Sequence, residues 1–197
     1  MPPRILSRRS LSGDALDVAP SLLNKVLVHG DRAGRIVEVE AYRGAEDPAS
    51  HAYRGVTPRT AVMFGPAGYL YVYFSYGMHW CANVVTGPEG EANAVLVRAL
   101  TPLEGIDAMR VARPRARLET DLTSGPAKLC QALGIDGTHD GIDLLHRSSA
   151  IRLVDDGTPP PARPTVGPRV GISAAQDRPW RFSVAGSPHR SRPRPRP

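Results

Sequence analysis

Five short runs of apolar, β-branched and aromatic residues most constrain the fold of this chain. Runs of this length, with alternating or continuous apolar character, are typical of β-strands. The segment GPEGE, between the runs at residues 79–85 and 92–100, has the composition of a turn. The runs are KVLVHG (25–30), RIVEVEAY (35–42), YLYVYF (69–74), HWCANVV (79–85) and ANAVLVRAL (92–100), with a shorter candidate at 150–154 and further ordered segments at 169–173 and 180–184. They predict a mostly antiparallel sheet.

Helical signals are fewer and shorter. Residues 14–24 show near-helical apolar spacing, and Pro20 makes that helix short or kinked. Residues 101–104 (TPLE) have the spacing of a capping box and predict a helix that runs to about Arg113. Another helix should begin near Pro126 and end at Gly134. We therefore expect an α+β fold: one domain whose mostly antiparallel, curved sheet is flanked by short helices and carries a protruding β-hairpin.

Size and composition limit the class of protein. A chain of 197 residues with 41% hydrophobic and 22% charged residues can bury a core as one domain. No apolar run approaches the ~18 to 20 residues of a membrane span, so no membrane partner is expected. Cys81 and Cys130 stand far apart, which predicts neither a disulfide framework nor a metal site. A reducing cytoplasm is the expected location, and no cofactor is expected.

The net charge of +6 is concentrated near one end of the chain. Residues 176–197 hold six arginines and one aspartate, a net of +5, which leaves +1 for the rest. We divide the chain into a basic N-terminal arm (1–12), one domain (13–187) and a disordered Arg/Pro-rich tail (188–197). A basic tail can hold phosphates without specificity, although a solvated end is the simpler interpretation.

The strand at 35–42 carries two glutamates, an unusual composition for a strand. Glu38, Glu40 and Tyr42 share one face. That face could be solvated, or it could hold a partly buried carboxylate beside an aromatic ring, which would suit a general base. Arg98 lies in an apolar strand and needs a carboxylate partner there, because a buried unpaired charge is costly. Either glutamate could be that partner.

Four of the six tyrosines fall within residues 69–76. Tyr69, Tyr71 and Tyr73 lie on one face of the predicted strand and apolar residues on the other, which fits a buried strand. Tyr76 breaks this parity at a predicted turn, where an exposed ring can stack on bases or wedge between them. His51, in the preceding polar loop, is by itself typical of an incidental surface histidine.

Two further places could bind a ligand or could serve only the fold. Asn83 lies on the strand after the tyrosines, where its amide must hydrogen-bond either backbone or ligand. Ser124 and Gly125, with Lys128 in the next turn, could hold an anion at a helix N-terminus, or they could simply cap that helix.

Long motifs of this chain resemble those of one enzyme family. They are RIVEVEAYRGAEDPASH, TPRTAVMFGPAGYLYVYFSYGMHWCAN, VLVRALTPLEG, TSGPAKLCQALGI and RFSVAGSPHRS. From about Leu16 to Ser191, the chain resembles the alkyladenine (3-methyladenine) DNA glycosylase family. The resemblance implies an enzyme that flips a damaged purine nucleotide out of double-stranded DNA and hydrolyses its N-glycosidic bond, leaving an abasic site.

The resemblance also implies roles for individual residues. Glu40 would be the general base, and Arg98 and His51 would orient the attacking water. The flipped base would stack among Tyr42, His51 and Tyr73, with Asn83 excluding bases that carry an extra amino group. DNA intercalation and phosphate contacts would come from Tyr76 as the wedge and from Met78, His79, Arg59, Ser124, Gly125 and Lys128.

Two features narrow the expected reaction. Lys25 and Lys128 are the only lysines and lie outside the catalytic motif, so we expect a monofunctional glycosylase without a Schiff-base step. The expected partner of this monomer is double-stranded DNA containing damaged purines. The alternative is a non-catalytic nucleic-acid-binding module with the same basic and aromatic surface. A zinc-dependent base deaminase is disfavoured because its H-x-E…P-C-x-x-C pattern is absent.

Overall fold

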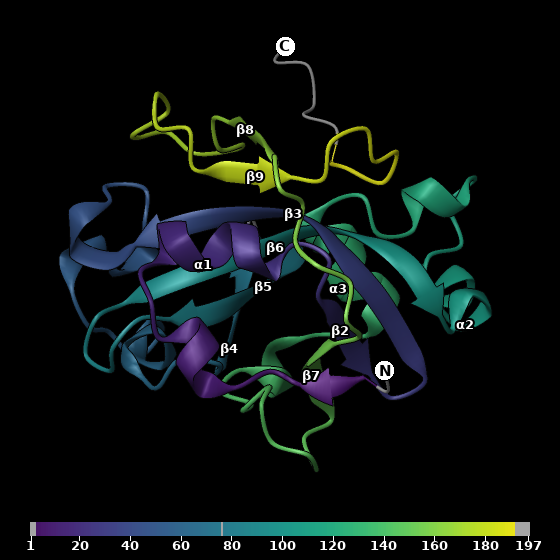
Figure 1. The fold of residues 1–197 in the computed structure, drawn as a ribbon, viewed down its shortest axis with the longest axis horizontal. Helices are drawn as coiled ribbons and strands as arrows, with labels where there is room; N and C mark the ends of the chain where they lie inside the picture. The colour runs from purple at the N-terminus through teal and green to yellow at the C-terminus, as the bar shows by residue number, and fades with distance from the viewer. Residues whose placement is uncertain (1–2, 76, 192–197) are drawn as a thin grey trace.

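A curled antiparallel sheet organises the protein. The computed structural model describes residues 3–75 and 77–191, and nine strands of this part form one sheet (Figure 1). The main order is β1-β7-β2-β3-β6-β5-β4, while β9 joins β3 beyond the end of β2 and β8 joins β9. The strands are Arg4–Ile5 (β1), Val26–His29 (β2), Arg32–Arg43 (β3), Leu70–Ser75 (β4), His79–Thr86 (β5), Asn93–Glu104 (β6), Ile151–Asp155 (β7), Thr165–Gly167 (β8) and Arg181–Ser183 (β9).

Three short α-helices pack on this sheet, which confirms the expected α+β fold. They are Ala15–Leu22 (α1), Ile106–Ala112 (α2) and Pro126–Leu133 (α3). Helix α1 packs on β3 and β6, and α3 on β5 and β6. The connections hold 3-10 turns at Arg8–Leu11 (η1), Gly44–Glu46 (η2), His51–Arg54 (η3), Ala61–Phe64 (η4), Glu119–Asp121 (η5) and Gly137–His139 (η6). As predicted, α3 begins with Pro126 and ends at Gly134, whose φ of 72° is left-handed.

The two faces of β4 enter different parts of the core. Leu70 and Val72 join the main apolar cluster beneath the helices. Tyr71 is buried on the other face with Met63, and the rings of Tyr69 and Tyr73 pack against that second cluster. The alternation predicted for this strand is therefore confirmed, and its tyrosine face is the one that reaches the site described below.

One local prediction is wrong. Residues 101–104 continue β6 instead of opening a helix, because their backbone pairs with β3 as far as the Ala33–Glu104 pair. The chain then turns at Gly105, with a φ of 68°, and α2 begins at Ile106. Residues 169–173, expected to be an ordered segment, form an irregular loop. The backbone N–H of Val170 donates to the Glu40 side chain rather than to a neighbouring strand.

Both ends of the described chain are packed. Strand β1 pairs with β7, and Leu11 in η1 is buried, so residues assigned to the arm belong to the sheet and core. Ser191 is buried against the sheet, so the ordered part extends past residue 187. Residues 192–197 lie outside the described range, and the division into arm, domain and tail remains a prediction. No helix in residues 3–75 and 77–191 is long and apolar enough to cross a membrane.

Candidate active site

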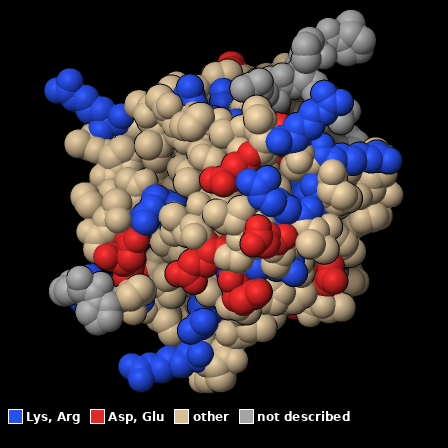
Figure 2. All heavy atoms as spheres, turned by 90° about the vertical axis from the view of Figure 1, so that its right-hand side faces the viewer, with Lys and Arg blue, Asp and Glu red and all other residues tan. Residues whose placement is uncertain are grey.

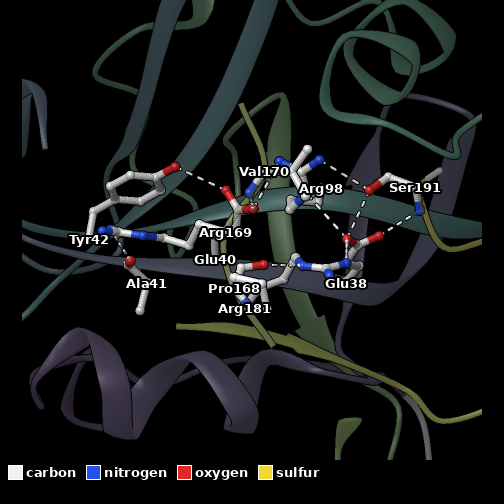
Figure 3. A network of polar contacts seen from close by, with 10 residues as sticks. All are labelled: Glu38, Glu40, Ala41, Tyr42, Arg98, Pro168, Arg169, Val170, Arg181 and Ser191. Carbon is white, nitrogen blue, oxygen red and sulfur yellow. Dashed lines mark hydrogen bonds and ion pairs between the residues drawn. The ribbon is translucent and has the colours of Figure 1, made fainter. Parts of the chain in front are cut away.

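The two glutamates of β3 lie in the interior beside Arg98. Glu38 and Glu40 are both 0% exposed, which excludes the solvated face considered from the sequence. Arg98 bonds both: its Nε lies 3.2 Å from Glu38 Oε1 and its Nη1 lies 3.1 Å from Glu40 Oε1 (Figure 3). The carboxylate partner that Arg98 needs is therefore supplied by both glutamates at once.

An irregularity in the sheet explains how one arginine reaches two carboxylates. Between β3 and β6 the register passes from the Glu38–Ala99 pair directly to the Val39–Val97 pair and skips Arg98. Such a bulge redirects a side chain that regular pairing would hold in line. Attraction to both carboxylates raises the pKa of Arg98 although its burial opposes this, so the guanidinium stays charged.

Glu40 accepts contacts from three described residues. Its Oε1 also accepts the backbone N–H of Val170 at 2.7 Å, and its Oε2 accepts the hydroxyl of Tyr42 at 2.9 Å. Burial, and then the neighbouring Glu40 charge, raise the pKa of Tyr42 well above its usual value. The Tyr42 hydroxyl therefore keeps its proton and donates a hydrogen bond to Glu40.

A cavity of about 550 Å³ opens beside this network. A volume of this size falls in the range of small-molecule sites. Its walls come from β3–β6, from η3 and the loop before it, and from the loop after β8. The predicted site residues that line it are Tyr42, His51, Tyr73, Asn83, Arg98 and Arg59. Glu40 has no exposed surface, and it reaches the cavity through Tyr42, Arg98 and Val170, which all line it.

His51 meets the tyrosine face of β4. Its Nδ1 lies 3.1 Å from the Tyr71 hydroxyl, and its ring stands edge-on to Tyr73 at 4.4 Å between centroids and 82° between planes. Ser50 caps the short turn that carries His51 by accepting the N–H of Ala52. Desolvation by its surroundings, with the nearby Arg59 charge, lowers the pKa of His51, so the imidazole is neutral at pH 7.

Asn83 lies on β5 directly opposite Tyr71 of β4. Its side chain is 4% exposed, and its Nδ2 donates to the backbone carbonyl of Tyr71 at 3.1 Å. One end of the amide is thus fixed by backbone while the residue lines the cavity. The sequence left backbone and ligand open as partners for this amide, and the structure supplies the backbone.

The residues predicted to contact DNA differ in exposure. Arg59 is exposed and lies over the Tyr73 ring at 5.5 Å. Met78 and His79 are exposed in the β4–β5 hairpin, while Tyr76 lies outside the described residues. At the start of α3, Lys128 donates to Ser124 at 3.1 Å and Gly125 is buried. On the face around α2, acidic and basic side chains lie interspersed (Figure 2).

The network also holds residues that were not predicted from the sequence, including Arg181 at Glu38. Asp47 and Arg169 form an ion pair in which both side chains are 0% exposed, and Arg169 lies over the Tyr42 ring at 4.6 Å. Val170 and Ser191 bond Glu40 and Glu38 through backbone N–H groups. Backbone donors carry no signal in a single sequence. A buried Arg169 needs a carboxylate partner, and this demand could have pointed to an acidic residue such as Asp47.

The sequence matches one known family over nearly its whole length. Residues 9–188 match the methylpurine-DNA glycosylase (MPG) family. The chain belongs to this family. Membership confirms the family indicated by the motifs and, with it, a monofunctional DNA glycosylase of DNA repair.

Similar bacterial proteins cover the same length. A protein of Burkholderia lata is 56% identical over 193 residues, which are 98% of this chain and 93% of that protein. A protein of Nocardia farcinica is 50% identical over 93% of this chain and 89% of its own length. One of Agrobacterium fabrum is 51% identical over 88% and 86%. All three carry the name "Putative 3-methyladenine DNA glycosylase".

Proposed function

We propose that this protein removes alkylated or deaminated purines from double-stranded DNA by flipping the damaged nucleotide into the cavity and hydrolysing its N-glycosidic bond. The observation that carries the proposal is the position of Glu40. A buried carboxylate, bonded to Arg98 and to a protonated Tyr42, stands directly behind a cavity lined by aromatic rings. A surface that only binds nucleic acid has no need of a carboxylate there, because its charge repels phosphates.

The carboxylate of Glu40 has capacity for a water molecule. A carboxylate oxygen can accept two hydrogen bonds, and among the described residues Oε2 accepts one, from Tyr42. A water bound there gives its proton to Glu40 and its oxygen to C1′ of the sugar. The glycosidic bond breaks with its electron pair moving to the purine. The negative charge of Glu40 also stabilises the oxocarbenium-like transition state.

The cavity suits an electron-poor purine. Tyr42, Tyr73 and His51 offer ring surfaces to a flat base, and a positively charged alkylpurine gains cation–π attraction from tyrosine rings. A neutral His51 avoids repelling that charge. Asn83 would limit the space and the hydrogen-bonding pattern at the base edge.

The rim would hold the duplex. In this proposal the β4–β5 hairpin enters the helix with Tyr76 as its wedge and Met78 and His79 beside it. Arg59, Ser124, Gly125 and Lys128 would contact phosphates at the cavity mouth. The buried thiols of Cys81 and Cys130 suit a reducing bacterial cytoplasm, where we expect a monomer to act on DNA.

Single-turnover base release tests the proposal. The substrate is duplex DNA carrying one 7-methylguanine or one hypoxanthine, and the readouts are free base and alkali-labile abasic sites. The wild type should release the base. Glu40→Gln should retain DNA binding and lose at least about 100-fold in rate, because it can no longer take a proton from water.

The outcomes separate the function from the mechanism. Binding without release on either lesion would support the non-catalytic nucleic-acid-binding module. Release at the wild-type rate by Glu40→Gln would leave the activity in place and remove Glu40 as its base. Strand cleavage without alkali would overturn the monofunctional reaction.

A further inference from the structure

Glu38 accepts four hydrogen bonds from described residues, yet it does not line the cavity. Its Oε1 accepts Arg98 Nε at 3.2 Å, Arg181 Nη1 at 3.1 Å and the Ser191 hydroxyl at 2.8 Å. Its Oε2 accepts the backbone N–H of Ser191 (Figure 3). Glu38, like Glu40, is 0% exposed, but of its partners Arg98, Arg181 and Ser191 only Arg98 lines the cavity. It therefore reaches the cavity only through Arg98.

The contacts of Arg98 show what Glu38 does. Three nitrogens of this guanidinium have different partners: Nε bonds Glu38, Nη1 bonds Glu40, and Nη2 donates to the Ser191 hydroxyl at 3.1 Å. A planar guanidinium held at all three nitrogens has one orientation. Glu38 and Ser191 fix the two nitrogens that Glu40 does not use, and so they set where Nη1 meets Glu40.

The charge balance of the network indicates a second role for Glu38. Glu38 and Glu40 supply two negative charges, and Arg98 and Arg181 supply two positive charges, so the network is neutral. Without the charge of Glu38, this interior would carry a net positive charge beside the sugar carbon that becomes positive during bond cleavage. Electrostatic destabilisation of that transition state is strong in a buried site.

We propose that Glu38 is a positioning residue for hydrolysis, which acts through Arg98 by fixing its guanidinium against Glu40 and by cancelling the charge of Arg181. Ser191, in the C-terminal segment, bonds both Arg98 and Glu38 and so helps to fix the same guanidinium. The inference rests on the proposed function, since it assumes that Glu40 activates the water. It adds a carboxylate outside the cavity to the groups that determine the rate of the chemical step.

The test compares Glu38→Gln, which keeps the shape and removes the charge, with the wild type. Single-turnover release of 7-methylguanine should slow by about 10- to 100-fold, the loss expected when a reacting group is held about 1 Å out of place. The dissociation constant for abasic-site DNA should stay at the wild-type value. Titration with that DNA counts folded molecules, so a merely structural role would lower rate and binding sites together.

Matched variants keep the test decisive. Asp156→Asn removes the carboxylate partner of Arg35, an arginine on β3 that does not line the cavity. This variant should leave the rate unchanged. Ser191→Ala should slow release less than Glu38→Gln and add no further loss to it, because both act through Arg98. If Glu38→Gln does not fold, Ser191→Ala decides alone.

The failures are distinguishable. No release by the wild type would remove the proposed function itself. Release by the wild type, its loss in Glu40→Gln and a wild-type rate in Glu38→Gln would remove only the role of Glu38. A loss in Glu38→Gln that adds fully to that of Ser191→Ala would show that the two do not act through one group.

Discussion

Arg169 shows how much of this site depends on residues that do not line the cavity. Its guanidinium lies over the Tyr42 ring at 4.6 Å and over the Trp180 ring at 4.9 Å. It donates to Asp47 Oδ1 at 2.8 Å and to the Ala41 carbonyl at 3.0 Å. These contacts tie the cavity wall at Tyr42 to the start of the loop that carries His51.

Asp47→Asn should therefore destabilise the fold strongly. It leaves the Arg169 charge buried without its counter-ion, a change that costs about 3–5 kcal/mol in comparable pairs. Urea unfolding measures the free energy. Glu119→Gln removes the partner of Arg110 from an exposed pair and should change it by about 1 kcal/mol or less. Equal effects of the two substitutions would contradict the importance of the buried pair.

The cavity tyrosines also predict how stability depends on pH. Burial raises the pKa of Tyr71 from 10.0 to about 12. A pKa that is higher in the folded state stabilises the fold fully below the unfolded value, and this contribution is lost as pH rises through the folded value. The free energy of unfolding should thus fall between pH 10 and about 12. In Tyr71→Phe this fall should be shallower, and identical slopes in the two proteins would refute the assignment.

At the scale of elements, the sequence predicts most strands but not where they stop. The apolar runs locate β3, β4 and β5 because each of these strands contributes several residues to the hydrophobic core. The end of β6 was missed because residues 101–104 have a strong local helix signal that pairing with β3 outweighs. The loop at 169–173 was missed because its contacts, to Glu40 and Asp47, lie over 120 residues away in the chain. The same holds for Ser191, 153 residues from Glu38.

The β4–β5 hairpin should affect DNA binding without affecting the fold. Met78 is 69% exposed, so Met78→Ala should change the free energy of unfolding by no more than about 0.5 kcal/mol. It should weaken binding to duplex DNA carrying a lesion, because an apolar side chain beside the wedge is lost. Val111→Ala, 82% exposed on α2, is the matched control and should alter neither property. Unchanged binding by Met78→Ala would place the hairpin away from the duplex.

At the scale of the whole molecule, the site is assembled from the length of the chain. Its parts come from β3, η3, β4–β6, the loop after β8, β9 and Ser191. The excess positive charge near the C-terminus begins within this assembly, since Arg181 bonds Glu38. A boundary drawn by composition alone therefore separates residues that work together.

Two truncations should locate the functional end of the chain. Removal of residues 192–197 should leave the single-turnover rate at the wild-type value, because the contacts to Glu38 and Arg98 remain. Removal of residues 187–197 takes away Ser191 and should slow release by about 10-fold or more. Equal rates for the two truncated proteins would mean that Ser191 has no part in placing Arg98.

The hydrogen bonds that Ser191 donates to Glu38 have a consequence for protein synthesis. Translation delivers Glu40, the cavity rings and Arg98 well before Ser191, and pairings between such distant residues form slowly. A nascent chain still on the ribosome can thus expose the tyrosine-lined cavity while Arg98 still lacks its hydrogen bond to Ser191. Competence to cut glycosidic bonds would then arise only after Ser191 has emerged and bonded Glu38 and Arg98.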